Sequence, residues 1–291
     1  MNEFYFYKLT GAGNDFVFID RKQNPKISLT PSQINKICNR RFGIGADGVI
    51  IIQDVENFDF EMLYYNADGS TGSLCANGAR CAIWFAEKTN RLKNGKANFI
   101  SNGMTYSGIV ISDEKIKFNL NPPSKSKFNF RVRAANQLIK ADFIDTGSPH
   151  IVIEVTDVLK DPMNPSSSYK SISEFPVYTL GKELRYHKDF SPAGANVNFY
   201  CIEDNKIHIR TYERGVEDET LACGTGSVAT AISVYFNKKI SPPISLITWG
   251  GETLIVNFDV ENQKVSNVSL TGPAKIVFEG KISGNFFTNM E

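Results

Sequence analysis

Two stretches decide the fold of this chain: FEMLYYNADGSTGSLCANGARCAIWFAEK at 60–88 and KIHIRTYERGVEDETLACGTGSVATAISVYF at 206–236. Each predicts a strand, a polar turn, a cysteine, a glycine-containing segment and an amphipathic helix. The two cysteines, Cys75 and Cys223, stand about half of the 291-residue chain apart. Because strand, cysteine and helix agree in order and spacing, we infer an internal duplication with one cysteine at the same place in each of two similar domains.

The sequence around these two stretches predicts short strands separated by Gly, Asn and Asp turns, so the expected class is α/β. In the N-terminal half the expected strands cover 4–9, 16–20, 48–53, 58–65 and 108–120. Two helices are expected there, at 30–39 with Thr30 or Ser32 as cap and at 77–89 with Asn77 as cap. In the C-terminal half a helix is expected at 224–237, with strands at 141–145, 151–155, 196–203, 206–213, 244–249, 252–259 and 265–271. The basic run 125–133 predicts a solvated crossover between the domains.

Composition excludes several classes of protein. Apolar residues make up 42% of the chain and the longest apolar run, 81–86, is far shorter than the roughly 20 residues of a membrane helix. A net charge of +1 offers no field for nucleic acid or an anionic membrane, so neither is an expected partner. The first residues, MNEFYFYKLT, lack the apolar core of a secretory signal, which predicts a cytoplasmic protein with five reduced cysteines. Three scattered histidines and no CxxC pattern predict no metal site.

Cys75 and Cys223 are the residues whose surroundings point to chemistry. Each directly precedes a predicted helix, where the helix dipole and unpaired N–H groups favour a thiolate. By contrast, Cys81 falls within an apolar helical stripe and is expected to be buried packing, as are Cys38 and Cys201.

A pair of symmetric thiols narrows the choice of reaction. A thiol protease needs one cysteine with a histidine base, and a redox pair is normally CxxC. Two thiols facing across a cleft suit inversion at one carbon, because one thiolate removes a proton while the other thiol delivers one to the opposite face. The two helix N-termini would hold the substrate carboxylate.

Seven ordered sequence blocks resemble the diaminopimelate epimerase family: GAGNDF (11–16), RFGIGADG (41–48), YNADGSTGSLCANGARC (65–81), DTGSPH (145–150), ANVNF (195–199), YERGVEDETLACGTG (212–226) and GPAKIVFEG (272–280). The resemblance implies two pseudo-symmetric domains, each a mainly antiparallel sheet wrapped around a central helix, with the active site in the cleft between them. It also implies that the C-terminal segment completes the first domain, which gives 1–122 plus 274–291 and 123–273.

The resemblance further implies an isomerase that needs no cofactor such as pyridoxal phosphate. It would convert LL-2,6-diaminoheptanedioate to the meso form, in lysine and peptidoglycan precursor biosynthesis, and would often be a homodimer. Cys75 and Cys223 match the acid/base pair, and His150 and Glu213 match residues that tune the thiols. The positions that match substrate contacts are Asn14, Asn66, Ala76, Asn77, Ser148, Asn196, Glu213, Arg214, Gly224 and Thr225.

Each of these residues also has a structural interpretation. Asn14 and Asn66 could be turn residues, and Asn77 could be only a helix cap. Arg214 beside Glu213 could form a surface ion pair, and His150 could be a satisfied loop histidine.

Three positions depart from the commonest family pattern. Ala76 stands where glycine is usual and suits the site only if it is helical; Ser148 replaces asparagine, and Gly48 replaces a glutamine found in some members. These departures leave open a racemase of the same fold that acts on another amino acid. A non-catalytic amino-acid-binding or thiol-redox protein is the alternative from another class.

Overall fold

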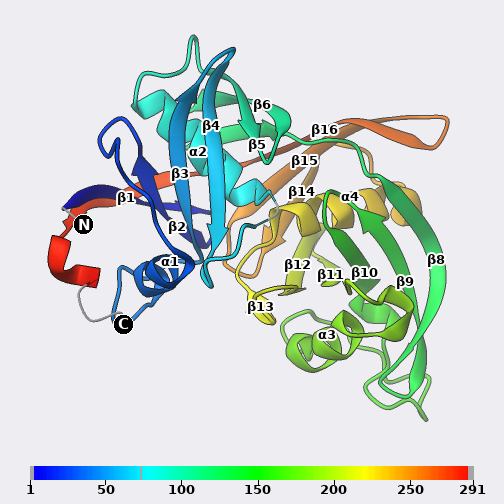
Figure 1. Cartoon of the computed structure of the whole chain (residues 1–291). Helices are drawn as coiled ribbons and strands as arrows, with labels where there is room; N and C mark the ends of the chain where they lie inside the picture. The colour runs from blue at the N-terminus through cyan, green and yellow to red at the C-terminus, as the bar shows by residue number, and fades with distance from the viewer. Residues whose placement is uncertain (1–2, 73, 288–291) are drawn as a thin grey trace. The chain divides into compact units, whose positions relative to one another are not determined.

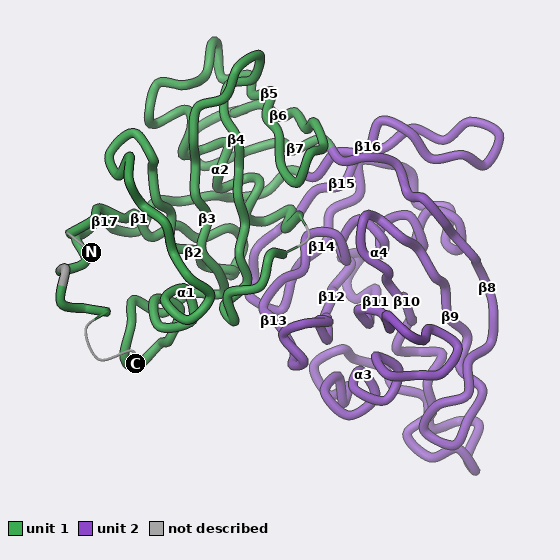
Figure 2. Tube along the Cα trace, in the orientation of Figure 1, with its two compact units in different colours: residues 1–119, 271–291 green, residues 120–270 purple. Residues whose placement is uncertain are grey.

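The computed structural model describes residues 3–72 and 74–287 and is shown in Figure 1. The chain divides into two compact units, coloured separately in Figure 2: unit 1 is 1–119 with 271–291, and unit 2 is 120–270. Both crossings between the units lie three residues N-terminal to the boundaries expected from the sequence. No helix in the described part of the chain is long and apolar enough to cross a membrane.

Unit 1 is a sheet wrapped around one helix. Its elements are β1 (Phe4–Gly11), β2 (Asn14–Asp20), α1 (Pro31–Cys38), β3 (Gly48–Val55), β4 (Phe58–Asn66), α2 (Ala76–Lys88), β5 (Lys96–Ser101), β6 (Met104–Ser112), β7 (Lys115–Asn119), β17 (Lys275–Ile282) and a final 3₁₀ turn (Gly284–Phe287). The central helix α2 packs against β1, β6, β7 and β4, and also against β2, β3 and β17. Sheet strands therefore surround most of its circumference.

Unit 2 repeats this plan around α4. Its elements are β8 (Lys125–Ala134), β9 (Gln137–Asp145), β10 (Pro149–Glu154), α3 (Val177–Arg185), β11 (Asn196–Glu203), β12 (Lys206–Glu213), β13 (Asp218–Thr220), α4 (Gly224–Lys238), β14 (Ile244–Thr248), β15 (Thr253–Glu261) and β16 (Lys264–Pro273), with 3₁₀ turns at Val155–Asp157 and Lys188–Phe190. The helix α4 packs against β9, β10, β11, β12, β14 and β15.

Strand pairing confirms the duplication. In unit 1, β2 pairs parallel with β3, β3 antiparallel with β4, β4 parallel with β5 and β5 antiparallel with β6. The same sequence of directions links β10, β11, β12, β14 and β15 in unit 2. In addition, β17 pairs with β1 as β8 pairs with β9, so the C-terminal segment completes unit 1.

The two central helices are buried all round, whereas the sequence predicted amphipathic helices. Every residue of α2 from Ala76 to Ala86 is buried, and in α4 every residue from Gly224 to Val234 except Thr225. Alanine, glycine, cysteine and serine dominate these turns and let strands approach from several sides. The C-terminal turns reach solvent, and both helices carry a lysine there, Lys88 in α2 and Lys238 in α4.

Three further differences from the predicted elements have local causes. The strand expected at 108–120 is a hairpin, because Glu114 turns the backbone with a φ of 58° between β6 and β7. The basic run is not irregular: it forms β8, in which Lys127, Arg131 and Arg133 are exposed and alternate with residues facing the core. The elements β5, α3, β13 and β17 were not predicted.

The cap of α1 is Thr30, one of the two predicted caps. It accepts a hydrogen bond from the Gln33 N–H in a reciprocal capping box.

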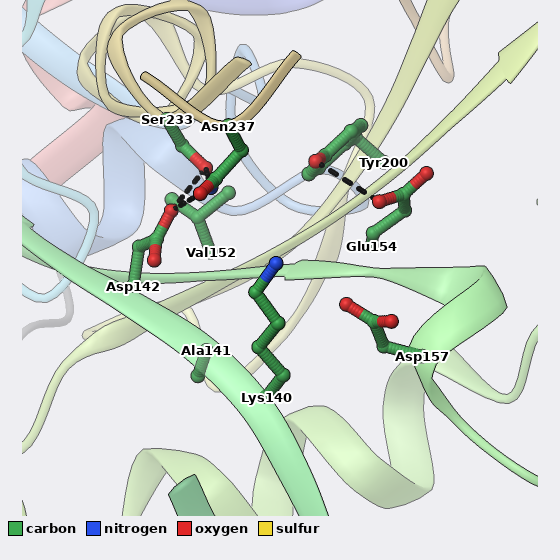
Figure 3. A pocket seen from close by; sticks show the side chains of 9 residues that line it. All are labelled: Lys140, Ala141, Asp142, Val152, Glu154, Asp157, Tyr200, Ser233 and Asn237. Carbon is green, nitrogen blue, oxygen red and sulfur yellow. Dashed lines mark hydrogen bonds between the residues drawn. The ribbon is translucent and has the colours of Figure 1, made fainter. Parts of the chain in front are cut away.

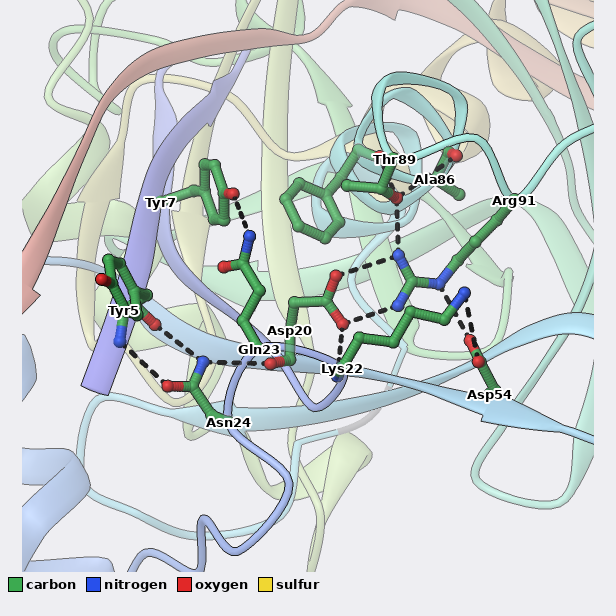
Figure 4. Close-up of polar contacts among 11 residues, drawn as sticks. Tyr5, Tyr7, Asp20, Lys22, Gln23, Asn24, Asp54, Ala86, Thr89 and Arg91 are labelled. Atoms are coloured by element: carbon green, nitrogen blue, oxygen red, sulfur yellow. Dashed lines mark hydrogen bonds and ion pairs between the residues drawn. The ribbon is translucent and has the colours of Figure 1, made fainter. Parts of the chain in front are cut away.

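A buried ion pair ties the far end of α2 to the sheet of unit 1 (Figure 4). The Arg91 guanidinium, just after the helix, donates to both carboxylate oxygens of Asp20 at 2.6 and 3.0 Å, and it also donates to Thr89 and to Asp54. The side chains of Arg91 and Asp20 are only 2% and 4% exposed, whereas Asp54 is 58% exposed. The ion pair with Asp20 is therefore the buried one, and the ion pair with Asp54 lies at the surface.

We expect the Asp20→Asn variant to lower the free energy of unfolding by about 3–5 kcal/mol, because it removes the only buried carboxylate that pairs with the buried Arg91 guanidinium among the described residues and leaves it the exposed Asp54 alone. Chemical denaturation of the purified variant measures this loss. The matched variant Asp54→Asn removes an exposed partner of the same guanidinium and should cost less than about 1 kcal/mol. Equal losses of unfolding free energy for the two variants would contradict the conclusion that Asp20 is the buried partner of Arg91.

Candidate functional site

In unit 1, Cys75 occupies the N-cap of α2, with φ −92° and ψ 114°, and is half-buried. The first backbone N–H groups of the helix follow it directly and have no partner within the helix. Ala76 is the first helical residue, so its side chain is compatible with the backbone there and the departure from glycine is accommodated. The prediction that Asn77 caps this helix is wrong, because the helix starts before it and Asn77 is buried within the first turn.

Asn14 and Asn77 are brought together by a chain of hydrogen bonds. Asn14 Nδ2 donates to Asp47 Oδ2 at 3.0 Å, while Asn14 Oδ1 accepts from Asn77 Nδ2. Asn77 Oδ1 in turn accepts from the guanidinium of Arg80 at 2.9 Å. Arg40 holds Asp47 from the other side at 2.7 Å. A carboxylate at one end and a guanidinium at the other therefore fix which way both amides face.

Arg80 places a buried positive charge beneath the first turn of α2. Its side chain is 0% exposed, and its Nε has no hydrogen-bond partner among the described residues. Burial lowers the pKa of Arg80 to about 10, an effect that the charges of Cys81 and Cys75 oppose. The Arg80 guanidinium is therefore close enough to Cys75 for the two groups to interact electrostatically. Arg80 was not predicted, although an arginine inside an otherwise small and apolar helical stripe was a usable signal.

Asn66 and Gly48 lie around the ring of Tyr64. Asn66 ends β4 and donates to Ser70 Oγ at 3.0 Å within the turn that follows. A Cβ on Gly48 would come within 2.7 Å of the Tyr64 ring, and a Cβ on Gly72 would meet the other edge of the same ring. Tyr64 thus fills the space beside Gly48, which explains why no glutamine side chain fits at that position.

In unit 2, Cys223 occupies the N-cap of α4, as Cys75 does in α2, with φ −122° and ψ 115°. It is 6% exposed. Gly224 and Thr225 form the start of the helix, and Thr225 Oγ1 lies 3.6 Å from Cys223 Sγ. The equivalence predicted for the two cysteines is therefore present in their local structure.

His150 is a buried residue of β10 rather than a loop histidine. Its Nε2 lies 3.0 Å from Thr225 Oγ1 and its Nδ1 lies 3.1 Å from Asn198 Nδ2. Burial, assisted by the charge of Arg214, lowers the pKa of His150 to about 3. The imidazole is therefore neutral near pH 7, and it reaches Cys223 through Thr225. Asn198 was not predicted; its signal was a second asparagine facing inward from the ANVNF strand.

Asn196 organises the residues around it within unit 2. Its Nδ2 donates to Ser148 Oγ at 2.6 Å and to the Pro149 carbonyl at 3.0 Å, while its Oδ1 accepts from the Arg214 N–H at 2.9 Å. Asn196 thereby holds the turn at Ser148 next to the end of β12. Glu213, the last residue of that strand, accepts from Thr220 Oγ1 at 3.0 Å.

Arg214 is half-buried, and its guanidinium forms no ion pair with any described residue. A surface ion pair with Glu213 is therefore not the arrangement in this structure. A positive charge that is partly desolvated and close enough to His150 to lower its pKa suits an anionic ligand such as a carboxylate.

The remaining cysteines are buried and poorly suited to acid/base work, as the sequence predicted. Burial raises the pKa of Cys38 to about 12 and that of Cys201 to about 11, and it raises the pKa of Cys81 well above the usual range.

A polar cavity elsewhere in unit 2 is too small for a substrate (Figure 3). It lies between β9, β10 and α4, and its lining includes Lys140, Glu154 and Asp157. Its volume of about 10 Å³ is near the lower limit for one water molecule. At one side Asp142 accepts hydrogen bonds from Ser233 and Asn237, which fastens α4 to β9.

We expect His150 to make the stability of the protein fall with acid. The histidine stays neutral in the fold until about pH 3, whereas in the unfolded chain it takes up a proton below about pH 6.5. Between these values the unfolded state binds more protons, so the free energy of unfolding should drop by up to about 1.4 kcal/mol per pH unit from this residue. Denaturation at pH 4–7 should show a steeper fall for wild type than for His150→Asn, and equal slopes would contradict a buried neutral imidazole.

Comparisons with known proteins bear on the family and the fold of this chain. The diaminopimelate epimerase family model matches residues 6–125 and 143–277. The diaminopimelate epimerase of Chlorobaculum tepidum is 40% identical over 94% of this chain and 100% of its own length, and that of Aquifex aeolicus is 36% identical over 96% and 97%. Among solved structures, a PhzF-family phenazine biosynthesis protein from Bacillus anthracis (TM-score 0.70, 16% identity, 97% of this chain and 99% of its own) and a hydroxyproline epimerase from Agrobacterium vitis (0.69, 12%, 97% and 93%) share the fold. The chain belongs to the diaminopimelate epimerase family.

Proposed function

We propose that this protein epimerises LL-2,6-diaminoheptanedioate to the meso form without a cofactor, as a step of lysine and peptidoglycan precursor biosynthesis. The thiolate of one cysteine takes the α-proton and becomes a thiol. The thiol of the other cysteine gives its proton to the opposite face of the carbanion and becomes a thiolate. The substrate carbon keeps its electron pair throughout, so no oxidant or reductant is needed.

One observation carries this proposal: each unit places a cysteine at the N-cap of its buried central helix. The N–H groups of the first helical turn, in Ala76 and Asn77 of α2 and in Gly224 and Thr225 of α4, can bind a carboxylate and the charge that develops on it. A single such helix would suit many thiol enzymes. Two equivalent ones suit a reaction that needs a proton carrier on each face of one carbon.

The other side chains would recognise the rest of the substrate. Arg214 supplies a guanidinium for a carboxylate, and Glu213 a carboxylate for an ammonium group. Asn14 and Asn77 present amides whose direction is already fixed within unit 1. Asn66, Ser148 and Asn196 complete the set of proposed contacts, of which Asn196 acts by holding Ser148 and Arg214.

We further infer that the protein works in the cytoplasm as a homodimer, with the amino acid as its partner and without nucleic acid or membrane. The free thiols of Cys38, Cys81 and Cys201 support the cytoplasmic location, and the balanced charge of the protein supports the statement on nucleic acid and membrane. The dimer rests on the family alone, and sedimentation of the purified protein tests it.

The cysteine assignment predicts the result of three substitutions. Cys75→Ala and Cys223→Ala should each lower epimerisation of LL-diaminopimelate by at least about 10²–10⁴-fold, because one face loses its proton carrier. Cys81→Ala changes a buried thiol in the same helix as Cys75 and should stay within a few-fold of wild type. Incorporation of deuterium from solvent into the substrate, with analysis of both stereoisomers, measures the reaction. Loss of activity in Cys81→Ala alone would overturn the assignment. If the wild type epimerises only another amino acid, the reaction type stands and the assignment of diaminopimelate as the substrate is wrong.

The guanidinium of Arg214 predicts a second result. Arg214→Lys should lower kcat/KM by an amount equivalent to about 2–5 kcal/mol, since an ammonium group cannot make the two parallel hydrogen bonds of a guanidinium. Arg131→Lys on the exposed face of β8 is the matched control and should be indistinguishable from wild type. Full activity in Arg214→Lys would place Arg214 outside the substrate site.

A further inference from the structure

Asn198 has a fixed direction in the core of unit 2. It lies on β11 with its side chain completely buried. Its Nδ2 donates to the carbonyl oxygen of Ile151 at 3.0 Å, and its Oδ1 accepts from Thr211 Oγ1 at 3.0 Å. A carbonyl oxygen can only accept, so the reversed amide would set two acceptors against each other. The NH₂ group must therefore face Ile151 and, 3.1 Å away, His150 Nδ1.

This direction determines the tautomer of His150. An amide nitrogen only donates, so His150 Nδ1 must be the acceptor and carries no proton. The imidazole is neutral, and its one hydrogen therefore sits on Nε2. That N–H points to Thr225 Oγ1 at 3.0 Å and donates to it.

The same logic continues to the sulfur of Cys223. Thr225 Oγ1 accepts from His150, so its own hydrogen is directed elsewhere. Cys223 Sγ lies 3.6 Å away, within the range of a hydrogen bond to sulfur. Four residues on three elements thus form one series of hydrogen bonds, in which the Ile151 carbonyl sets the donor directions as far as Thr225. In the last contact either Thr225 Oγ1 or Cys223 Sγ can be the donor.

We infer that Asn198 is a positioning residue for Cys223: it holds His150 in the Nε2–H form, which makes the Thr225 hydroxyl a donor to the Cys223 sulfur. A donor stabilises the thiolate over the thiol, so the chain prepares Cys223 to take a proton. The role of this chain in catalysis rests on the proposed function, but the order of its hydrogen bonds does not.

The substitutions that test this series of hydrogen bonds do not remove the charged groups around it. Glu213 and Arg214 come from the end of β12, and Arg214 is the charge that acts on His150. In unit 1 the residue equivalent to Thr225 is Asn77, whose amide belongs to the chain ending at Arg80. The two sulfurs therefore have different supports: a hydroxyl donor at Cys223 and a buried guanidinium near Cys75.

The first experiment reads the tautomer without substrate. Long-range ¹H–¹⁵N spectra distinguish an unprotonated ring nitrogen from a protonated one, and the His150 signals are identified by their loss in His150→Asn. We expect an unprotonated Nδ1 and a protonated Nε2 at pH 7. In Asn198→Asp the carboxylate can only accept, so the hydrogen should move to Nδ1. A wild-type His150 protonated on Nδ1, or on both nitrogens, would overturn the inference.

The second experiment measures the reactivity of the Cys223 sulfur and does not depend on whether Asn198→Asp folds. In a Cys75→Ala background, iodoacetamide labels Cys223, and peptide mapping follows its rate from pH 6 to pH 9. Thr225→Val removes the hydroxyl at nearly constant shape and should slow labelling below pH 8 by about five- to tenfold, the loss expected for one donor to a thiolate. Thr225→Ser keeps the hydroxyl and should label within about threefold of its parent. Equal rates for the valine and serine variants would refute the donor role of Thr225.

Epimerisation of diaminopimelate by the wild type is measured alongside. An inactive wild type whose His150 and Cys223 behave as described would remove the proposed function and leave this inference standing. If the wild type is active but Thr225→Val changes neither the labelling rate nor kcat, the proposed function stands and the inference about Thr225 and Cys223 is wrong.

Discussion

The structure depends on one constraint: the bodies of α2 and α4 must be buried while their first turns remain polar. Sheets surround each helix, so its interior turns are built from small and apolar residues. The backbone N–H groups of the first turn cannot be satisfied within the helix, and burying them empty would be costly. A cysteine stands at the N-cap of both helices, and its side chain makes no capping bond to those groups in either one.

Close packing at the helix starts comes from a glycine in the same place in both units. A Cβ on Gly78 would meet Ile50 of β3, and a Cβ on Gly226 would meet Asn198 of β11. The duplicated positions thus share their geometry but not their chemistry. An apolar partner in unit 1 and an amide in unit 2 give the two cysteines different surroundings on the same backbone. Ile50 and Asn198 therefore occupy equivalent positions in the two folds but make the surroundings of the two cysteines different.

The sequence predicted most of this fold because its strongest signals are local. The strands Asn196–Glu203 and Lys206–Glu213 match their predicted bounds, and the cysteine-to-helix junctions lie where the repeated pattern placed them. The same reasoning failed where tertiary contacts override a local rule. Asn77 is a good cap by residue type, yet it is drawn into the helix because Asn14 and Arg80 bind its side chain. Asn198 escaped prediction because its partners His150 and Ile151 are distant in sequence. Arg80 has near partners, but its burial depends on strands from other parts of unit 1. Burial of an isolated polar residue cannot be deduced from its neighbours alone.

The pairing of β1 with β17 has a consequence for how the protein is made. Strand β1 leaves the ribosome before unit 2, and β17, spanning residues 275–282, leaves it after unit 2. Unit 2, by contrast, is a continuous segment whose equivalent strand, β8, precedes β9. During synthesis unit 2 can therefore close before unit 1, in which β1 can pair with β2 but keeps its other edge unpaired until β17 has been made. The half of the molecule that begins first is finished last.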